Sequence, residues 1–286
     1  MADPYVPKFC KFPEDSSWAI SWVELGFGVC ARACVIDGVS APYHPREGPA
    51  LFRDRSDGQV LVDEFVKALS HAPLALRAEL VLAEAQKKIH DLSGVFAPSF
   101  LETQSVPPGA SFAYVQIDWR GITLFTAGDC LVVWEDADGK RYGIPNQSYE
   151  YNRAVEGRFR EIRAEHPDLF DAWDIHLREV VPYKANRLNR PGGIAEMNGD
   201  PNIIDCWKSF VLQTGVRRMI LGTDGVFPGD LTRNPGNLAE YVFTLYDQGG
   251  IPAIIASTKA LEQKEKNTSW VPDDGHTEAT AIAIEL

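Results

Sequence analysis

Three short apolar segments follow one another in the middle of the chain, at 110–117, 121–126 and 130–134. Each is rich in β-branched and aromatic residues, and only three residues separate it from the next. A parallel connection between neighbouring strands needs about a dozen residues or more, so strands this close in sequence are predicted to pair antiparallel. This run therefore predicts antiparallel sheet at the centre of the fold.

The rest of the chain divides into strand-like and helix-like segments. Strand patterns occur at 18–23, 30–36 and 280–286, and helical patterns at 60–91, 237–246 and 252–266. Residues 147–188 are charged and mixed, and we expect an inserted helical lobe there. Strands and helices in separate layers are typical of an α+β fold. Because we find no internal repeat and no long linker, residues 1–286 are predicted to form a single domain.

Charge and cysteine content exclude several classes of protein. The net charge is −12, from 28 basic and 40 acidic residues, which argues against a nucleic-acid-binding protein. The sequence has no apolar run long enough to span a membrane and no signal-peptide pattern at its start, which predicts a cytoplasmic protein. The five cysteines form no Cys-x-x-Cys pair, so neither a disulfide framework nor a zinc knuckle is expected. The sequence gives no indication of oligomeric state.

Acidic residues mark the ends of several predicted strands. Asp-Gly pairs begin at residues 37, 57, 138, 224 and 274. The pairs at 57 and 138 have polar surroundings and are interpreted as turns, whereas Asp37 and Asp224 directly follow apolar strands and Asp129 ends a third. If these ends converge, the result is a pocket of oxygen ligands, which favours Mg²⁺ or Mn²⁺ over zinc. Two such ions about 3.5–4 Å apart can activate a water for attack on phosphorus.

Five short acidic motifs follow one another along the chain: Pro13-Glu14-Asp15-Ser16, Val35-Ile36-Asp37-Gly38, Ala127-Gly128-Asp129-Cys130, Ile220-Leu221-Gly222-Thr223-Asp224-Gly225 and an Asp-rich segment before the last strand. Their order resembles that of the motifs in the metal-dependent protein serine/threonine phosphatases of the PP2C type. The resemblance spans nearly the whole chain. It implies an αββα sandwich of two antiparallel sheets flanked by helices. It also implies hydrolysis of phosphoserine or phosphothreonine in a phosphoprotein substrate, with a metal-bridged hydroxide attacking phosphorus in line.

The resemblance also implies roles for individual residues. Asp37 would bridge two metal ions, and the Gly38 carbonyl would bind one of them. Glu14 and Asp224 would bind the other, while Asp129 with Asp224 could hold a third, looser ion. Asp37 and Asp224 are therefore the predicted catalytic residues.

The last motif does not identify its ligand uniquely. Asp274 is the preferred metal ligand at the C-terminal end of the chain, and Asp273, Glu278 or no ligand at all are the alternatives. The correct choice depends on where the final strand begins.

The first motif and the residues just before it differ from the family pattern. The family has asparagine where this chain has Pro13, and a phosphate-binding arginine where this chain has Cys10. Lys11, close by, is the candidate substrate-binding residue, although a lysine supplies a point charge rather than a bidentate fork. These departures motivate two alternatives: a catalytically impaired binding or regulatory module, and a two-metal phosphatase that acts on a small phosphoester.

One basic segment admits two interpretations. Arg187 and Arg190 lie close together in the sequence and could contact a phosphorylated partner, or could belong to an ordinary charged rim.

Overall fold

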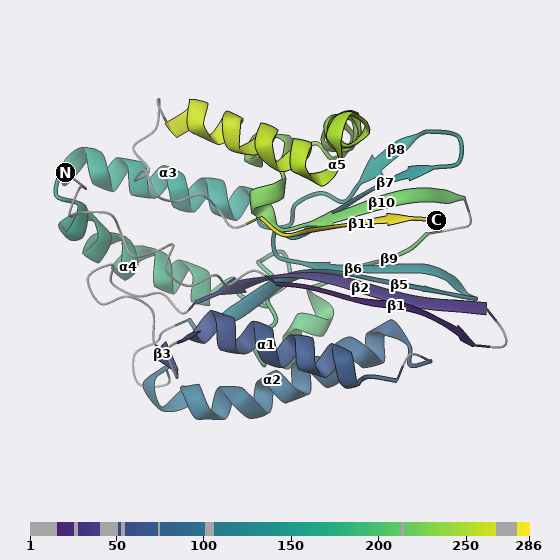
Figure 1. Cartoon of the computed structure of the whole chain (residues 1–286). Coiled ribbons are helices and arrows are strands. Elements are labelled where there is room, and N and C mark those ends of the chain that lie inside the picture. Colours follow the sequence, from purple (N-terminus) through teal and green to yellow (C-terminus); the bar gives the residue numbers. More distant parts are fainter. Residues whose placement is uncertain are drawn as a thin grey trace.

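The computed structural model describes residues 16–25, 28–40, 51–52, 55–73, 75–100, 106–212, 215–266 and 279–286. Within them, two antiparallel sheets lie face to face with helices on both outer sides (Figure 1). None of the helices in these ranges has the length and hydropathy of a membrane span.

Counted over the described residues, the first sheet has five strands and the second has four. In spatial order the first contains β1 (Ser16–Leu25), β2 (Gly28–Val39), β5 (Gly109–Asp118), β6 (Gly121–Ala127) and β9 (Lys208–Leu212). The second contains β11 (Ala281–Glu285), β10 (Val216–Gly222), β7 (Leu131–Asp136) and β8 (Arg141–Gly143). Every pairing in both sheets is antiparallel. A separate short ribbon consists of β3 (Leu51–Phe52) and β4 (Arg55–Ser56).

Helices cover the two outer faces and one end. The helices α1 (Asp57–His71) and α2 (Ala78–Phe100) cover the first sheet, and α5 (Pro235–Lys266) covers the second (Figure 1). The backbone of α5 breaks at Gly249 and Gly250, which agrees with the two helices predicted there. The predicted lobe at 147–188 contains α3 (Tyr149–Glu165) and α4 (Leu169–Ala185), which lie at one end of the sandwich (Figure 1). The αββα sandwich expected from the sequence is confirmed.

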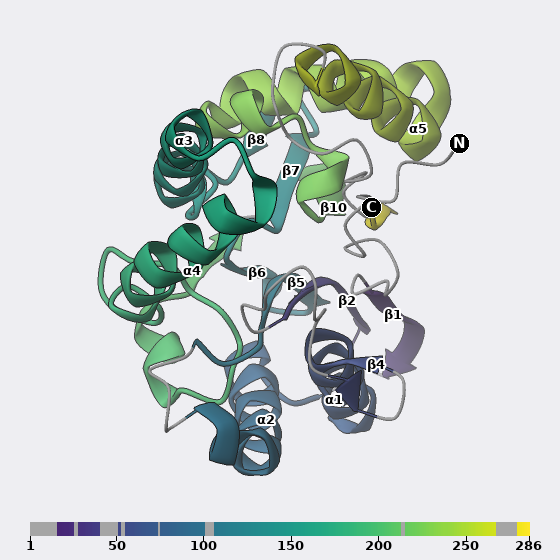
Figure 2. The same cartoon turned by 90° about the vertical axis from the view of Figure 1, so that its left-hand side faces the viewer.

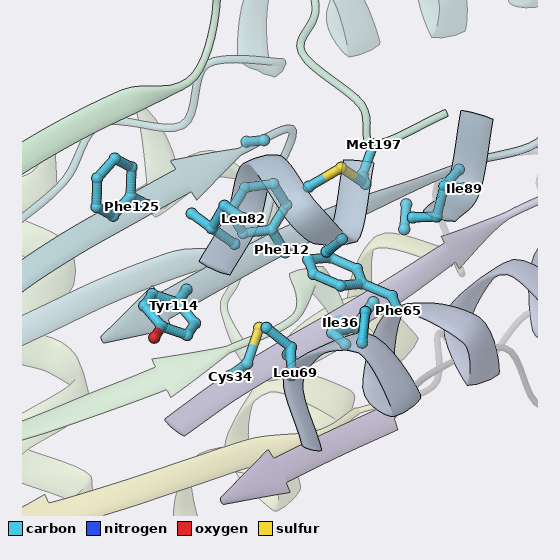
Figure 3. Close-up of a cluster of buried hydrophobic side chains, with 14 of the residues drawn as sticks. Cys34, Ile36, Phe65, Leu69, Leu82, Ile89, Phe112, Tyr114, Phe125 and Met197 are labelled. Atoms are coloured by element: carbon cyan, nitrogen blue, oxygen red, sulfur yellow. The ribbon is translucent and has the colours of Figure 1, made fainter. Parts of the chain in front are cut away.

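Strand alternation builds three apolar layers. Successive side chains of a strand point to opposite faces, so Phe112 and Tyr114 of β5 pack against α1 and α2, while Ala113 and Val115 face the other sheet. Figure 3 shows the helix-facing cluster, in which Phe65 of α1 meets Phe112 edge to face at 5.4 Å between ring centroids. A third cluster packs β7 and β10 against α5. The central strands β5, β7 and β10 are therefore packed on both faces.

The prediction that β6 and β7 pair with each other is wrong. These strands belong to different sheets, and the connection through Gly128 carries the chain from one layer to the other. Gly128 has φ +70°, and a Cβ built on it would lie 2.0 Å from the Ser111 hydroxyl oxygen. Only glycine permits this approach, and it lets the chain leave the first sheet rather than fold back along it.

The interpretation of Asp57-Gly58 as a turn is also wrong. These residues open α1, where the Ser56 hydroxyl accepts a hydrogen bond from the Gln59 amide at 3.1 Å. Asp57 is buried in the first helical turn, where a carboxylate is favoured by the helix dipole.

Candidate metal centre and its surroundings

Asp37 lies near the end of β2, on a central strand of the first sheet. It is the register partner of Ser111 at the start of β5, and Gly38 is the partner of Ala110. Asp37 is partly exposed, whereas Gly38 is buried. The two residues expected to bind a metal through a carboxylate and a carbonyl are therefore held in regular strand geometry, with pairing on the β5 side.

Asp129 lies beside the same part of the sheet. Ser111, the partner of Asp37, packs directly against Gly128, the residue before Asp129. One carboxylate oxygen of Asp129 accepts a hydrogen bond from the side-chain amide of Asn152 in α3, at 3.2 Å. The connection between the sheets thus carries Asp129 toward Asp37 and joins it to the helical lobe.

Asp224 follows the end of β10 in the second sheet. Thr223 fixes this position, because its amide donates to the Thr280 carbonyl at 3.0 Å and its hydroxyl accepts from the Thr280 amide at 3.1 Å. Asp224 then begins the 3₁₀ helix η3 (Asp224–Val226), whose end is closed by the Phe227 amide donating to the Asp224 carbonyl. Asp224 is partly exposed at the end of a buried strand.

The strand register places these three carboxylates at one end of the sandwich. Gly222 of β10 pairs with Leu131 of β7, so Asp224 and Asp129 each lie two residues beyond this pair. Asp37 belongs to the same end through Ser111 and Gly128. β1 and β11 also begin at this end, since Ser16 pairs with Ile36 and Ala281 with Gly222. Figure 2 faces this end, where α3 and α4 lie.

Several predicted site residues lie outside the described part of the chain: Lys11, Glu14, Asp273, Asp274 and Glu278. Cys10 and Pro13, which depart from the family pattern, do too. Within the described ranges, no three His, Cys, Asp or Glu side chains form a group that could hold a metal ion. Asp37, Asp129 and Asp224 therefore share an end of the fold without by themselves making a closed ligand cluster.

A buried ion pair at this end was not predicted from the sequence. Glu196, 4% exposed, accepts from the Lys184 ammonium at 2.8 Å through one carboxylate oxygen. Its other oxygen, Oε2, is buried and has no hydrogen-bond partner among the residues that the structure describes. A Cβ on Gly109 at the start of β5 would lie 2.7 Å from this oxygen, so Glu196 packs tightly on the strand that carries Ser111. No local sequence pattern identifies a buried glutamate in a loop.

Aromatic side chains lie next to this ion pair. Tyr151 stacks on Tyr183 with ring centroids 5.6 Å apart and 15° between the rings. Burial raises the pKa of Tyr151 well above its usual range, and the charge of Glu196 adds to this effect. Because Tyr151 precedes Asn152, the stacked pair lies next to the contact that α3 makes with Asp129.

Among the comparisons with known proteins, only the comparison with solved structures finds similar proteins. No protein-family model matches the sequence, and no curated protein matches it either. The crystal structure of a bacterial serine phosphatase variant is similar over 98% of this chain and 94% of that chain, with a TM-score of 0.51 and 9% identity.

Other solved structures give slightly lower scores. The catalytic domain of the serine/threonine protein phosphatase PstP, in complex with two manganese ions, is similar over 95% of this chain and 90% of that chain, with 13% identity and a TM-score of 0.49. RsbX in complex with magnesium is similar over 94% and 85%, with 10% identity and a TM-score of 0.47. At such low sequence identity a structural similarity identifies the fold alone. The similarity to the bacterial serine phosphatase is the one that identifies it here. Together with its two-sheet topology, this likeness shows that the chain has the fold of the PP2C-type serine/threonine phosphatases.

Proposed function

We propose that this protein is a Mg²⁺- or Mn²⁺-dependent phosphatase that hydrolyses phosphoserine or phosphothreonine in proteins. The observation that carries the proposal is that Asp37, Asp129 and Asp224 lie at one end of the sandwich, although they come from three segments distant in sequence. The fold supports a phosphatase, and the choice of reaction and substrate rests on the order of the acidic motifs.

The chemistry of the donor set fits hard divalent cations. Asp37, Asp129 and Asp224 offer carboxylate oxygens and Gly38 offers a carbonyl, and oxygen ligands of this kind favour Mg²⁺ or Mn²⁺. In the proposed site Asp37 would serve both of two ions and the Gly38 carbonyl would serve one of them. Glu14 and Asp224 would hold the other, and Asp129 with Asp224 would hold a third. Asp274 would complete the ligand set. When bound, such ions lower the pKa of a water and neutralise charge on the phosphoryl oxygens.

The protein's own contribution is to orient these groups. β2 holds Asp37 on a strand that is paired on both sides, and the two hydrogen bonds between Thr223 and Thr280 fix the backbone before Asp224. The Asn152 amide orients Asp129, as hydrogen bonds from outside the ligand set commonly do in metal sites. Lys11 supplies a positive charge for the substrate phosphate in this proposal.

The first test is hydrolysis of an aryl phosphate and a phosphoserine peptide, each with and without Mn²⁺. We expect turnover of both substrates only with the metal. The variants Asp37→Asn and Asp224→Asn should each lose at least about a hundredfold in turnover, because each removes a charged ligand. Circular dichroism and thermal unfolding show whether the variants remain folded.

Each other outcome points to one alternative. Parent-like activity in a folded Asp37→Asn or Asp224→Asn variant removes that residue from the site. Turnover of the aryl phosphate alone favours a phosphatase of small phosphoesters. Absence of metal-dependent turnover on both substrates favours a binding or regulatory module.

A further inference from the structure

An arginine is displayed on an aromatic stack beside the carboxylate end. The guanidinium carbon of Arg187 lies 3.7 Å from the centroid of the Tyr183 ring, and Tyr183 stacks on Tyr151. Tyr183 covers one face of the guanidinium, which leaves the N–H groups at its edge available to a ligand. We call Tyr151, Tyr183 and Arg187 the arginine shelf.

The backbone under the shelf is held by hydrogen bonds and close packing. Asn189 is fully buried with φ +51°, and its side chain bonds the backbone of Glu196 in both directions, at 2.9 and 3.0 Å. The amide of Ile194 donates to the Arg187 carbonyl at 3.1 Å. A Cβ on Gly193 would lie 1.9 Å from the same carbonyl oxygen, so only glycine fits there. Arg187 is thus presented by a closed loop rather than by a free surface segment.

The shelf is also joined to the proposed metal centre. Lys184, one residue after Tyr183, pairs with Glu196 against the start of β5. On the other side, Asn152 follows Tyr151 and donates to Asp129. A substrate bound at the carboxylate end therefore has the shelf as a neighbour along the surface.

Arg187 is exposed, and no carboxylate in the described ranges forms an ion pair with it. The protein as a whole carries a net charge of −12, so its long-range field repels acidic partners. A partner with acidic residues therefore needs a local cation to bind. An arginine fixed over an aromatic ring suits this role, because its planar fork can bind a carboxylate with two parallel hydrogen bonds.

We propose that Arg187 is a specificity-determining residue that docks an acidic side chain of the phosphorylated protein, near the residue being dephosphorylated. This inference rests on the proposed function for the identity of the partner. It makes Arg187 a docking group rather than a replacement for the phosphate-binding arginine absent at Cys10.

Two fluorescent phosphoserine peptides test this proposal: one followed by three glutamates and one followed by three glutamines. The affinity of each peptide is measured by fluorescence anisotropy with the full-length Asp37→Asn protein. Peptide binding can then be measured independently of hydrolysis. We expect the glutamate peptide to bind more tightly, and Arg187→Ala to weaken it about tenfold, the effect of one exposed charge-assisted contact. The affinity for the glutamine peptide should change less than twofold.

Arg190→Ala is the matched control, since Arg190 is an exposed arginine of the same loop whose charge acts near Cys206 instead. It should bind both peptides as the parent does. Tyr183→Phe keeps the ring and should retain the preference, while Tyr183→Leu should lose it. Equal effects of Arg187→Ala and Arg190→Ala, or equal affinity for the two peptides, would overturn the docking role. If the parent protein hydrolyses neither the aryl phosphate nor the phosphoserine peptide but the preference for the glutamate peptide is intact, only the proposed function is overturned.

Discussion

Two buried glutamates, one on each side of the molecule, have very different surroundings. Glu135 on β7 is 3% exposed, and both of its oxygens accept hydrogen bonds from Arg218, with a further one from Arg141 at 2.9 Å. Glu196 is 4% exposed, and within the described ranges its carboxylate is paired only with Lys184, which leaves Oε2 without a partner there. Equal burial with unequal pairing indicates that the first group stabilises the fold, whereas the second retains capacity for another interaction.

The contrast extends beyond the two glutamates. Among the described residues, buried side-chain atoms without a hydrogen-bond partner occur in Gln86, Ser148, His176 and Glu196. All but Gln86 belong to the helical lobe and the loop after it, between 148 and 196. Within the described residues, buried polar atoms without a partner are therefore concentrated in the lobe and the loop after it, at the end of the sandwich where the carboxylates lie. Such atoms are common near functional sites.

The largest expected effect is the loss of the arginine that pairs with Glu135. Arg218→Met leaves Glu135 buried with fewer partners and removes cation–π contacts to Phe243 and Tyr246. We expect the free energy of unfolding in urea to fall by about 3–5 kcal/mol, as when one partner of a buried pair is removed. The neighbouring Arg217→Met removes a mostly exposed partner of Glu135 and should cost less than about 1 kcal/mol. Similar losses in both variants would contradict this account.

Acid should weaken the same pairing. Hydrogen bonds from Arg218 hold the pKa of Glu135 below its usual range, against the effect of burial. The stabilisation is therefore complete above the pKa of the unfolded chain and is lost as pH falls through the lower, folded value. The difference in stability between parent and Arg218→Met should shrink at acid pH for this reason.

A second and smaller effect concerns the lobe. Burial between Phe159 and Trp173 lowers the pKa of His176 to about 4, and the opposing charge of Glu179 only partly offsets this. Between about pH 6.5, the ordinary value, and about pH 4 the unfolded chain binds a proton that the folded chain does not, so stability falls as pH falls. The loss is on the order of 1–3 kcal/mol.

His176→Phe should abolish this loss, and unfolding in urea between pH 7 and pH 4 measures it. His166→Phe, at an exposed histidine after α3, is the control and should keep the acid dependence of the parent. If the two variants respond alike to acid, another group is responsible.

The sequence predicted the layers of the fold because period-2 and helical patterns report burial directly. It also predicted that Asp129 and Asp224 follow strands, which is a local property of each segment. Asp37, which was predicted to follow a strand, instead lies within β2, two residues before its end at Val39. The sequence did not predict that β6 and β7 lie in different sheets, because the three-residue connection is as short as a hairpin and the decisive contact is Ser111 against Gly128. The sequence also did not predict the short edge strand β9, because its largely exposed residues lack the apolar alternation of an interior strand.

The residues that contact the candidate site from the helical lobe and the loop after it could not be predicted from such sequence patterns. Asn152 and Glu196 come from segments with ordinary helical or loop composition, and their roles depend on contacts with Asp129 and Gly109. Such contacts exist only once the lobe has packed against the strand ends. Sequence patterns therefore identify residues on regular elements more readily than the groups that support them.

Among the changes to buried groups, the smallest effect on stability is expected at Glu196, and it sharpens the contrast with Glu135. Glu196→Gln keeps an oxygen for Lys184 and changes only the charge and the unpaired atom, so we expect a cost of about 1 kcal/mol in urea unfolding. Because this pair supports the loop that carries Arg187, the preference for the glutamate peptide should nevertheless fall severalfold. Glu135→Gln gives the matched comparison, with a larger loss of stability and an unchanged peptide preference in the protein that remains folded. A Glu196→Gln variant that loses as much stability as Glu135→Gln and keeps its peptide preference would show that both glutamates serve the fold alone.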